Sequence, residues 1–169
     1  EAGLLWGNVF ARSGEPDLAW ERYQQNQELY FDHQHKLSFE FIDLIIRGLL
    51  TQKETGEAIK VCRHFLIKRK DDKHVSNSER ARIQLLVGDA YFREESFEIA
   101  REEYNTVLTL PEYKDLPEHV SARFKVAQTL MSQKIFAKAE EIFEDLATSP
   151  DEDTMSRAHL MLGILFHAQ

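Results

Sequence analysis

The 169-residue sequence predicts an all-α fold built from repeated, antiparallel helix pairs. A signature of four residues recurs four times with the same internal gaps of 3, 9 and 4 residues. Gly and Pro are rare, with seven and four residues, which predicts short connections. No segment keeps the strict apolar–polar alternation that is typical of a strand. These observations together favour a helical repeat array.

The four signature positions have the same physical meaning in each repeat. The first is small in most repeats, so two helix backbones can approach closely, and a large apolar residue three positions later lies on the same helix face. The third is an alanine early in a second helix, where a larger side chain would push the pair apart. The fourth fills the layer between the helices. The positions are Gly7, Phe10, Ala19 and Tyr23; Ile46, Leu49, Ala58 and Cys62; Gly88, Tyr91, Ala100 and Tyr104; Ala127, Leu130, Ala139 and Phe143; and, in a fifth repeat, Gly163 and Phe166.

The periodicity predicts nine helices, and turn and cap residues set their ends. Ser76 followed by Glu79 fits a capping box at the start of the fifth helix. The polar stretch 69–77 is the best candidate for a flexible loop. Pro16, Pro117 and Pro150 lie where helices should begin or end. The expected helices span residues 2–13, 16–31, 37–51, 55–69, 77–94, 97–109, 117–133, 136–148 and 153–168.

The third repeat reads LLVGDAYFREESFEIAREEYNTVLTLP and resembles the tetratricopeptide repeat (TPR), a helix–turn–helix unit of about 34 residues. The first repeat is also similar, with Gly14 in its turn, whereas the second departs most, with Ile46 at the small position. Successive signature alanines lie 39, 42 and 39 residues apart, so the array is divergent, with lengthened loops or second helices.

The resemblance implies one right-handed superhelical stack of helix pairs, a TPR-like α-solenoid, over residues 1–169. Its units are expected at about 1–35, 36–75, 76–115 and 116–150, with a partial unit at 151–169. Both ends of the sequence look helical, so we expect the chain to be a fragment of a longer protein.

Composition narrows the function classes. Lys and Arg number 21 against 29 Asp and Glu, and the net charge of −8 argues against a nucleic-acid binder, including RNA binding by helical repeats. No apolar run reaches about 18 residues, so we expect a soluble chain without a membrane span, with the cytoplasm slightly favoured.

The sequence has none of the common enzyme motifs GxGxxG, GxxxxGK[ST], GxSxG or HExxH, and we expect no enzymatic activity, no cofactor and no metal. His33 and His35 are more consistent with solvated loop residues than with metal ligands. Cys62 is a single cysteine in a packing position, which favours a small buried hydrophobe over a nucleophile. Two acidic pairs on second helices are expected on a solvated outer face: Glu102 with Glu103, and Glu140 with Glu141.

The resemblance also implies that the first helix of each unit lines a concave groove. Among the residues expected to face this groove, six are basic and three are acidic when Glu40 is counted, although the whole chain is acidic. A row of apolar residues accompanies these charges, and the combination suits a peptide with acidic and hydrophobic residues. The alternative is that these apolar residues are contacts between neighbouring repeats. The partner-binding candidates are Asn8, Arg12, Arg47, Leu50, Arg82, Leu85, Asp89, Phe92, Arg93, Phe124, Lys125, Gln128 and Met131, with Asp43, Arg157 and Ile164 beside them.

One subclass of the family binds the EEVD tail of chaperones through lysines and asparagines on the first helices. Here Asn8 and Arg82 fit two of those positions, but Leu4, Leu44 and Leu86 occupy others, so the clamp is incomplete and this activity is not expected.

The sequence therefore predicts a non-enzymatic scaffold for a protein or peptide partner. The alternative is a sensor or regulatory segment of a larger enzyme or transcription regulator. We also expect Leu160, Ile164 and Phe166 to expose an apolar surface near the end of the chain, through which copies could associate.

Overall fold

The computed structural model describes residues 2–168, and in this range the chain forms ten α-helices, two short 3₁₀ helices and no strand. The elements are α1 (Ala2–Arg12), α2 (Pro16–Gln25), α3 (Gln27–His33), η1 (Gln34–Lys36), α4 (Phe39–Thr51), α5 (Thr55–Lys68), α6 (Asn77–Arg93), α7 (Phe97–Thr109), η2 (Pro111–Tyr113), α8 (Pro117–Ser132), α9 (Phe136–Ala147) and α10 (Glu152–Ala168).

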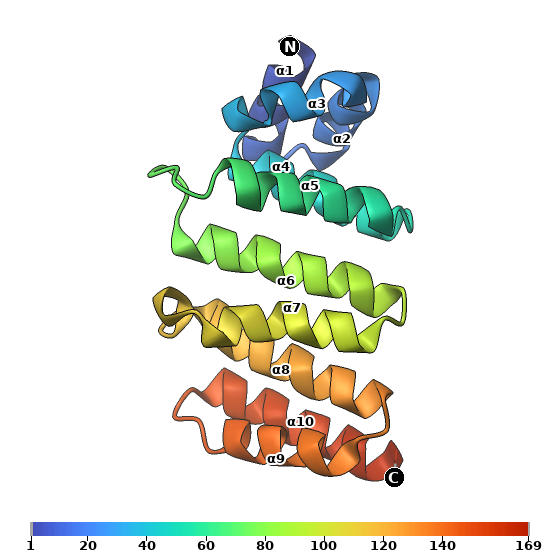
Figure 1. Ribbon diagram of the computed structural model, residues 1–169, viewed down its shortest axis with the longest axis vertical. Coiled ribbons are helices and arrows are strands. Elements are labelled where there is room, and N and C mark those ends of the chain that lie inside the picture. Colours follow the sequence, from blue (N-terminus) through green and yellow to red (C-terminus); the bar gives the residue numbers. More distant parts are fainter. Residues whose placement is uncertain (1, 169) are drawn as a thin grey trace.

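The helices stack one above another along the long axis of the molecule, with the two ends of the chain at opposite ends of the stack (Figure 1). Four antiparallel hairpins follow each other: α1–α2, α4–α5, α6–α7 and α8–α9. The last helix, α10, packs on α9. The predicted all-α stack of helix pairs is confirmed.

Most predicted helix ends agree with the structure to within two residues, because they depend on local signals. The capping box at the start of α6 is present, with the Ser76 side chain accepting from the Glu79 amide and the Glu79 carboxylate accepting from the Ser76 amide. The helix predicted over 97–109 has those ends.

The prediction of one helix over 16–31 was wrong, and this raises the count from nine to ten. The chain breaks between α2 and α3 at Asn26, whose φ and ψ are −132° and 22°. Its side-chain amide donates to the carbonyl of Arg22 at 2.8 Å, so it competes with the helix for a backbone acceptor. The same side chain fills the space beside Gly3, where a Cβ would lie 2.4 Å from Asn Nδ2. Gly3 therefore leaves the room that the Asn26 side chain occupies.

The turns inside the four hairpins share one backbone conformation. Gly14, Lys53, Glu95 and Lys134 lie seven residues after the first signature position, with φ of 78°, 64°, 59° and 60°. The following amide in each turn donates to the carbonyl five residues back, at 2.9–3.0 Å. This pattern satisfies carbonyls at the end of each first helix. Three of the turns therefore hold a side chain in a region that favours glycine.

The polar connection at 69–77 is tied to α6 by one arginine. Arg80 donates to the carbonyls of Val75 at 2.6 Å, Asp72 at 2.7 Å and Arg69 at 3.2 Å. Val75, within this connection, is buried. The guanidinium therefore supplies donors to a segment with little secondary structure of its own.

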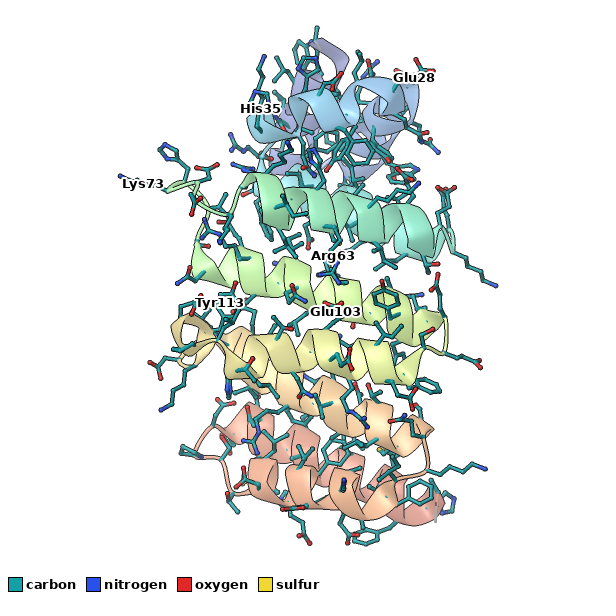
Figure 2. The ribbon with its side chains drawn as sticks, in the orientation of Figure 1. Glu28, His35, Arg63, Lys73, Glu103 and Tyr113 are labelled. Carbon is teal, nitrogen blue, oxygen red and sulfur yellow. The ribbon has the colours of Figure 1, made fainter. Side chains whose placement is uncertain are left out.

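One acidic residue predicted to be solvated is buried. Glu102 is exposed, as expected, but Glu103 accepts from Gln84 of α6 and pairs with Arg63 of α5. Figure 2 shows Arg63 and Glu103 approaching each other across α6. The prediction for Glu103 was wrong because the outer face of α7 is partly covered by the preceding hairpin, which the sequence of α7 alone does not reveal.

Candidate peptide-binding groove

The first helices of successive units are joined side by side through their cations. Arg12 of α1 lies 3.6 Å from Glu40 of α4, and Arg82 of α6 lies 3.1 Å from Asp43 of α4. Lys125 of α8 lies 2.6 Å from Asp89 of α6. At the last junction, the guanidinium of Arg157 on α10 stacks 4.2 Å from the ring centre of Phe124 on α8. Most of the predicted excess of basic charge is therefore used between repeats.

The carboxylate of Asp43 is shared by two arginines. Its Oδ2 accepts from Arg82 at 3.1 Å and from Arg47 at 2.8 Å. Its Oδ1 is buried without a hydrogen-bond partner among the described residues. Arg82 also lies over the ring of Phe39 at 5.5 Å. Two half-exposed guanidinium groups thus surround one carboxylate, leaving a local positive charge at the junction of α4 and α6.

The neighbouring carboxylate of Glu40 lies at the start of α4. A hydrogen bond from its own backbone amide lowers the pKa of Glu40, and Ser38 and Arg12 act in the same direction. It therefore stays ionised and complements the positive end of α4.

A cavity of about 320 Å³ lies on the next junction, between α6 and α8. Its wall combines a phenylalanine, a tyrosine, one side-chain amide and three charged groups. The lining residues are Asp89, Phe92, Arg93, Tyr104, Lys125 and Gln128.

The charges in this cavity are arranged around Asp89. Its Oδ1 accepts from the Tyr104 hydroxyl at 2.8 Å and from Lys125 Nζ at 2.6 Å. Burial, followed by the Asp89 charge and hydrogen bond, raises the pKa of Tyr104, so the phenol stays protonated and donates. The floor of the cavity is therefore a neutralised, hydrogen-bonded cluster. Arg93, at the rim, is exposed and has no ion pair within residues 2–168.

The structure brings together five of the predicted partner-binding residues: Asp89, Phe92, Arg93, Lys125 and Gln128. They lie one turn apart on neighbouring first helices, which is what the repeat spacing implied.

Three other candidates are buried and offer little surface to a partner. Leu50, Leu85 and Phe124 are 3%, 6% and 1% exposed and belong to the apolar clusters. The alternative considered from the sequence, contact between neighbouring repeats, describes these three. Met131 is half-buried against the second cluster.

The remaining candidates lie outside the α6–α8 cavity. Asn8 donates to the carbonyl of Lys36 at 3.2 Å and accepts from the amide of Ser38 at 2.8 Å, so it fixes the entry to α4. Asn8 and Arg12 line one recess at the start of α4. Arg47 lines another, shallow recess beside Trp20. The groove candidates are therefore divided among separate recesses.

Tyr104 is the cavity residue that sequence reasoning missed, because it occupies a packing position. Its ring fills the space beside Gly88, where a Cβ would lie 2.2 Å from the ring. A buried tyrosine needs a partner for its hydroxyl, and the phenylalanine at the same position of the fourth repeat does not. This difference was the available signal.

Other kinds of site find little support in the described range. Residues 2–168 contain no group of three or more His, Cys, Asp or Glu side chains that could hold a metal. Burial raises the pKa of Cys62, which disfavours the reactive thiolate. Within the same residues no helix has the length and apolar character to cross a membrane.

Comparisons with known proteins agree with this architecture. No family model matches the chain, and no curated protein matches it. One solved structure, assigned to a kinesin light chain of Podosopora anserina, contains TPR-like repeats that are nearly identical to one another. It aligns with this chain with a TM-score of 0.67 at 12% sequence identity. That alignment covers 99% of this chain and 85% of the other. A single-substitution variant of those repeats aligns with a TM-score of 0.68 at 13% identity, covering 99% and 84%. The chain has a TPR-type fold.

Proposed function

We propose that this array binds an extended segment of a partner protein in the cavity between α6 and α8. An acidic side chain of the partner would pair with Arg93, and an adjacent apolar side chain would pack on Phe92. The observation that carries the proposal is the exposed, unpaired Arg93 beside a half-buried aromatic ring in a cavity of about 320 Å³. This is the combination of a charge for orientation and an apolar contact for affinity that peptide grooves use.

The fixed cluster on the cavity floor supports the same proposal. Because Asp89 is already bound by Tyr104 and Lys125, it opposes an acidic ligand less than a free carboxylate would. Gln128 adds an amide that can both donate to and accept from an extended peptide backbone. The arrangement needs no catalytic group.

The proposal can be tested with an array of unstructured peptides in which Glu or Asp alternates with Leu or Phe. Binding is measured by fluorescence polarisation against the same peptides with Lys in place of the acids. We expect the acidic peptides to bind more tightly, with an affinity that falls as salt rises, because exposed charges are screened over about 8–10 Å.

Arg93→Glu should weaken the binding of acidic peptides by roughly tenfold or more, mainly through the association rate. Lys138→Glu is the matched control, since Lys138 is an exposed cation on α9 away from the cavity and the net charge changes equally. Equal losses in both variants would contradict a site at Arg93, as would acidic peptides that bind no better than basic ones.

Phe92→Ala should raise the dissociation rate, at a cost of about 1–3 kcal/mol if the ring is an anchor. Phe124→Ala is unsuitable as a binding test, because Phe124 is buried and its loss should instead destabilise the fold. Arg47→Glu maps the extent of the groove: an effect on peptide binding would extend the site to α4, and no effect would restrict it to the α6–α8 cavity.

A further inference from the structure

The acidic and basic side chains of α4 and α6 are used unequally. Every carboxylate on these two helices has a partner. The pairs are Glu40 with Arg12, Asp43 with Arg47 and Arg82, Glu79 with Ser76, and Asp89 with Tyr104 and Lys125. By contrast, Arg47 and Arg82 share one oxygen of Asp43, and Arg93 has no ion pair within residues 2–168. The charge that these helices leave for a ligand is therefore positive.

The two arginines beside Asp43 are held in place but remain accessible. Their side chains are 53% exposed for Arg47 and 45% exposed for Arg82. Arg47 donates to Asp43 through Nε, and Arg82 donates through one terminal nitrogen and also stacks on Phe39. A guanidinium carries five N–H donors, so each arginine keeps donors for a second carboxylate. Because both side chains are already positioned, less conformational entropy is lost when that carboxylate binds.

Arg82 and Arg93 lie along one face of α6. They are eleven residues apart, which in an α-helix is three turns plus about 20°, so their side chains leave the helix in nearly the same direction. The rise between them is about 16 Å. Between them on this face lie Leu86, which is buried, and Asp89, which is already bonded to Tyr104 and Lys125. The face thus has a cation at each end and no unpaired charge in the middle.

We propose that the partner segment carries two acidic side chains about five residues apart, one bound by Arg93 and the other by Arg47 and Arg82 together. The rise of about 16 Å matches about five residues of an extended chain, at about 3.3 Å for each residue. The apolar side chain that packs on Phe92 lies next to the acid that Arg93 binds. This spacing rests on the proposed function, since Arg93 is one of its two contacts. It is the property that would select one acidic segment over another.

Peptides of constant net charge test the spacing. Each carries a Leu–Glu pair and one further Glu in a background of Gly and Ser, with the two glutamates between about two and about eight residues apart and the further Glu on either side of the pair. Because the charge is the same throughout the series, differences in affinity report geometry. In fluorescence polarisation at one salt concentration, the spacing of about five should bind roughly fivefold or more tightly than the shortest and the longest spacings.

Substitutions at the α4–α6 junction test which residues read the spacing. Arg82→Gln should remove the preference, while the affinity for a peptide with the Leu–Glu pair alone stays within about twofold, because Arg93 is intact. Arg47→Gln should act in the same direction. Lys138→Gln is the matched control, since it removes one exposed cation on α9 and should keep the preference. Circular dichroism verifies that each variant remains helical.

Equal affinities at all spacings, or a best spacing well away from five, would overturn the two-acid arrangement. A preference that survives both Arg82→Gln and Arg47→Gln would overturn it as well. In either case the proposed function would stand if the peptide with the Leu–Glu pair alone still bound and lost affinity in Arg93→Glu. If no acidic peptide bound at all, the proposed function and the spacing would fall together.

Discussion

The second and third hairpins fill the same two positions with side chains of opposite size. In α6–α7, Gly88 on the first helix faces the ring of Tyr104 on the second. In α4–α5, the corresponding residues are Ile46 and Cys62, both fully buried. In the third hairpin the large residue is on the second helix and the small one on the first, whereas in the second hairpin the large residue is on the first helix and the small one on the second. What the repeat conserves is therefore the filled volume between two helices rather than a glycine.

The second hairpin is joined to its neighbours by polar contacts on both sides, as the third hairpin is through Arg63–Glu103 and Lys125–Asp89. Helix α5 is held by polar groups on both sides: His64 contacts Gln34, which also donates to Tyr30 at 2.7 Å, and Arg63 pairs with Glu103 of α7. The hairpin with the weakest signature thus has specific polar contacts at both of its borders. Repeat signatures describe contacts within hairpins better than contacts between them.

The largest effect on stability is expected from placing a large side chain opposite Tyr104 in the third hairpin. Gly88→Ile should cost about 3 kcal/mol or more in unfolding free energy, because even a Cβ would lie 2.2 Å from the ring of Tyr104. Adding Tyr104→Cys recreates the pair of the second hairpin and should recover part of the loss. Urea unfolding of the two single variants and the double variant measures the coupling. Additive effects would mean that the two positions do not exchange volume.

The control for position 88 is the open glycine of the fifth unit. Gly163→Ala should leave the stability unchanged or raise it by about 0.5–1 kcal/mol, since its Cβ meets nothing and alanine favours the helix. If Gly163→Ala lost as much stability as the change at Gly88, the cost would come from replacing any glycine inside a helix and not from a clash with the ring of Tyr104.

The next largest effect on stability is expected at Ala100, the signature alanine of the third hairpin. Ala100→Leu should overpack the contact between α6 and α7 and cost on the order of 1–3 kcal/mol, because Ala100 is fully buried. Glu102→Leu, two residues later on the exposed side, should change stability by about 0.5 kcal/mol at most. Equal shifts of the two urea midpoints would mean that the faces of α7 are wrongly assigned.

A somewhat smaller effect should separate the two adjacent glutamates of α7. Glu103→Ala removes the partner of Arg63 and Gln84 and should cost about 1–2 kcal/mol, since a partly buried donor loses its acceptor. Glu102→Ala is the matched control and should be close to neutral. If the border between the second and third hairpins depends on apolar contacts alone, the two alanine variants will unfold at the same urea concentration.

The smallest effect is expected in the turns. Lys53 of the second hairpin and Glu95 of the third have φ of 64° and 59°, a region that favours glycine. Lys53→Gly and Glu95→Gly should each raise the stability by about 0.5–1 kcal/mol, less the extra entropy of the unfolded chain. Thermal unfolding detects the shift. A loss of stability in either variant would show that its side chain makes a contact worth more than the relieved backbone strain.

The helix pairs could be predicted from the sequence because their signals are local. Gaps of 3, 9 and 4 residues fix which faces meet, and the Ser76–Glu79 capping box fixes a helix end. The break at Asn26 could not, because one asparagine inside a helical pattern does not by itself show whether its side chain bonds the backbone, as Asn26 does at the Arg22 carbonyl. In the candidate site, the repeat spacing placed Phe92 and Arg93 on the face of α6 that borders the cavity, and their role in binding stays a prediction. It did not reveal that Phe124 is covered, since burial there depends on how closely Arg157 of the next unit approaches.

The cation contacts between first helices make the junctions between hairpins sensitive to the solvent. Buried apolar side chains pack across these junctions as well as within each hairpin, and exposed ion pairs such as Arg12–Glu40, whose side chains are 67% and 56% exposed, add to them. Because exposed charges are screened over about 8–10 Å at physiological salt, ionic strength should weaken these ion pairs and leave the buried apolar contacts unaltered. The curvature that a long ligand meets is then set partly by the solvent.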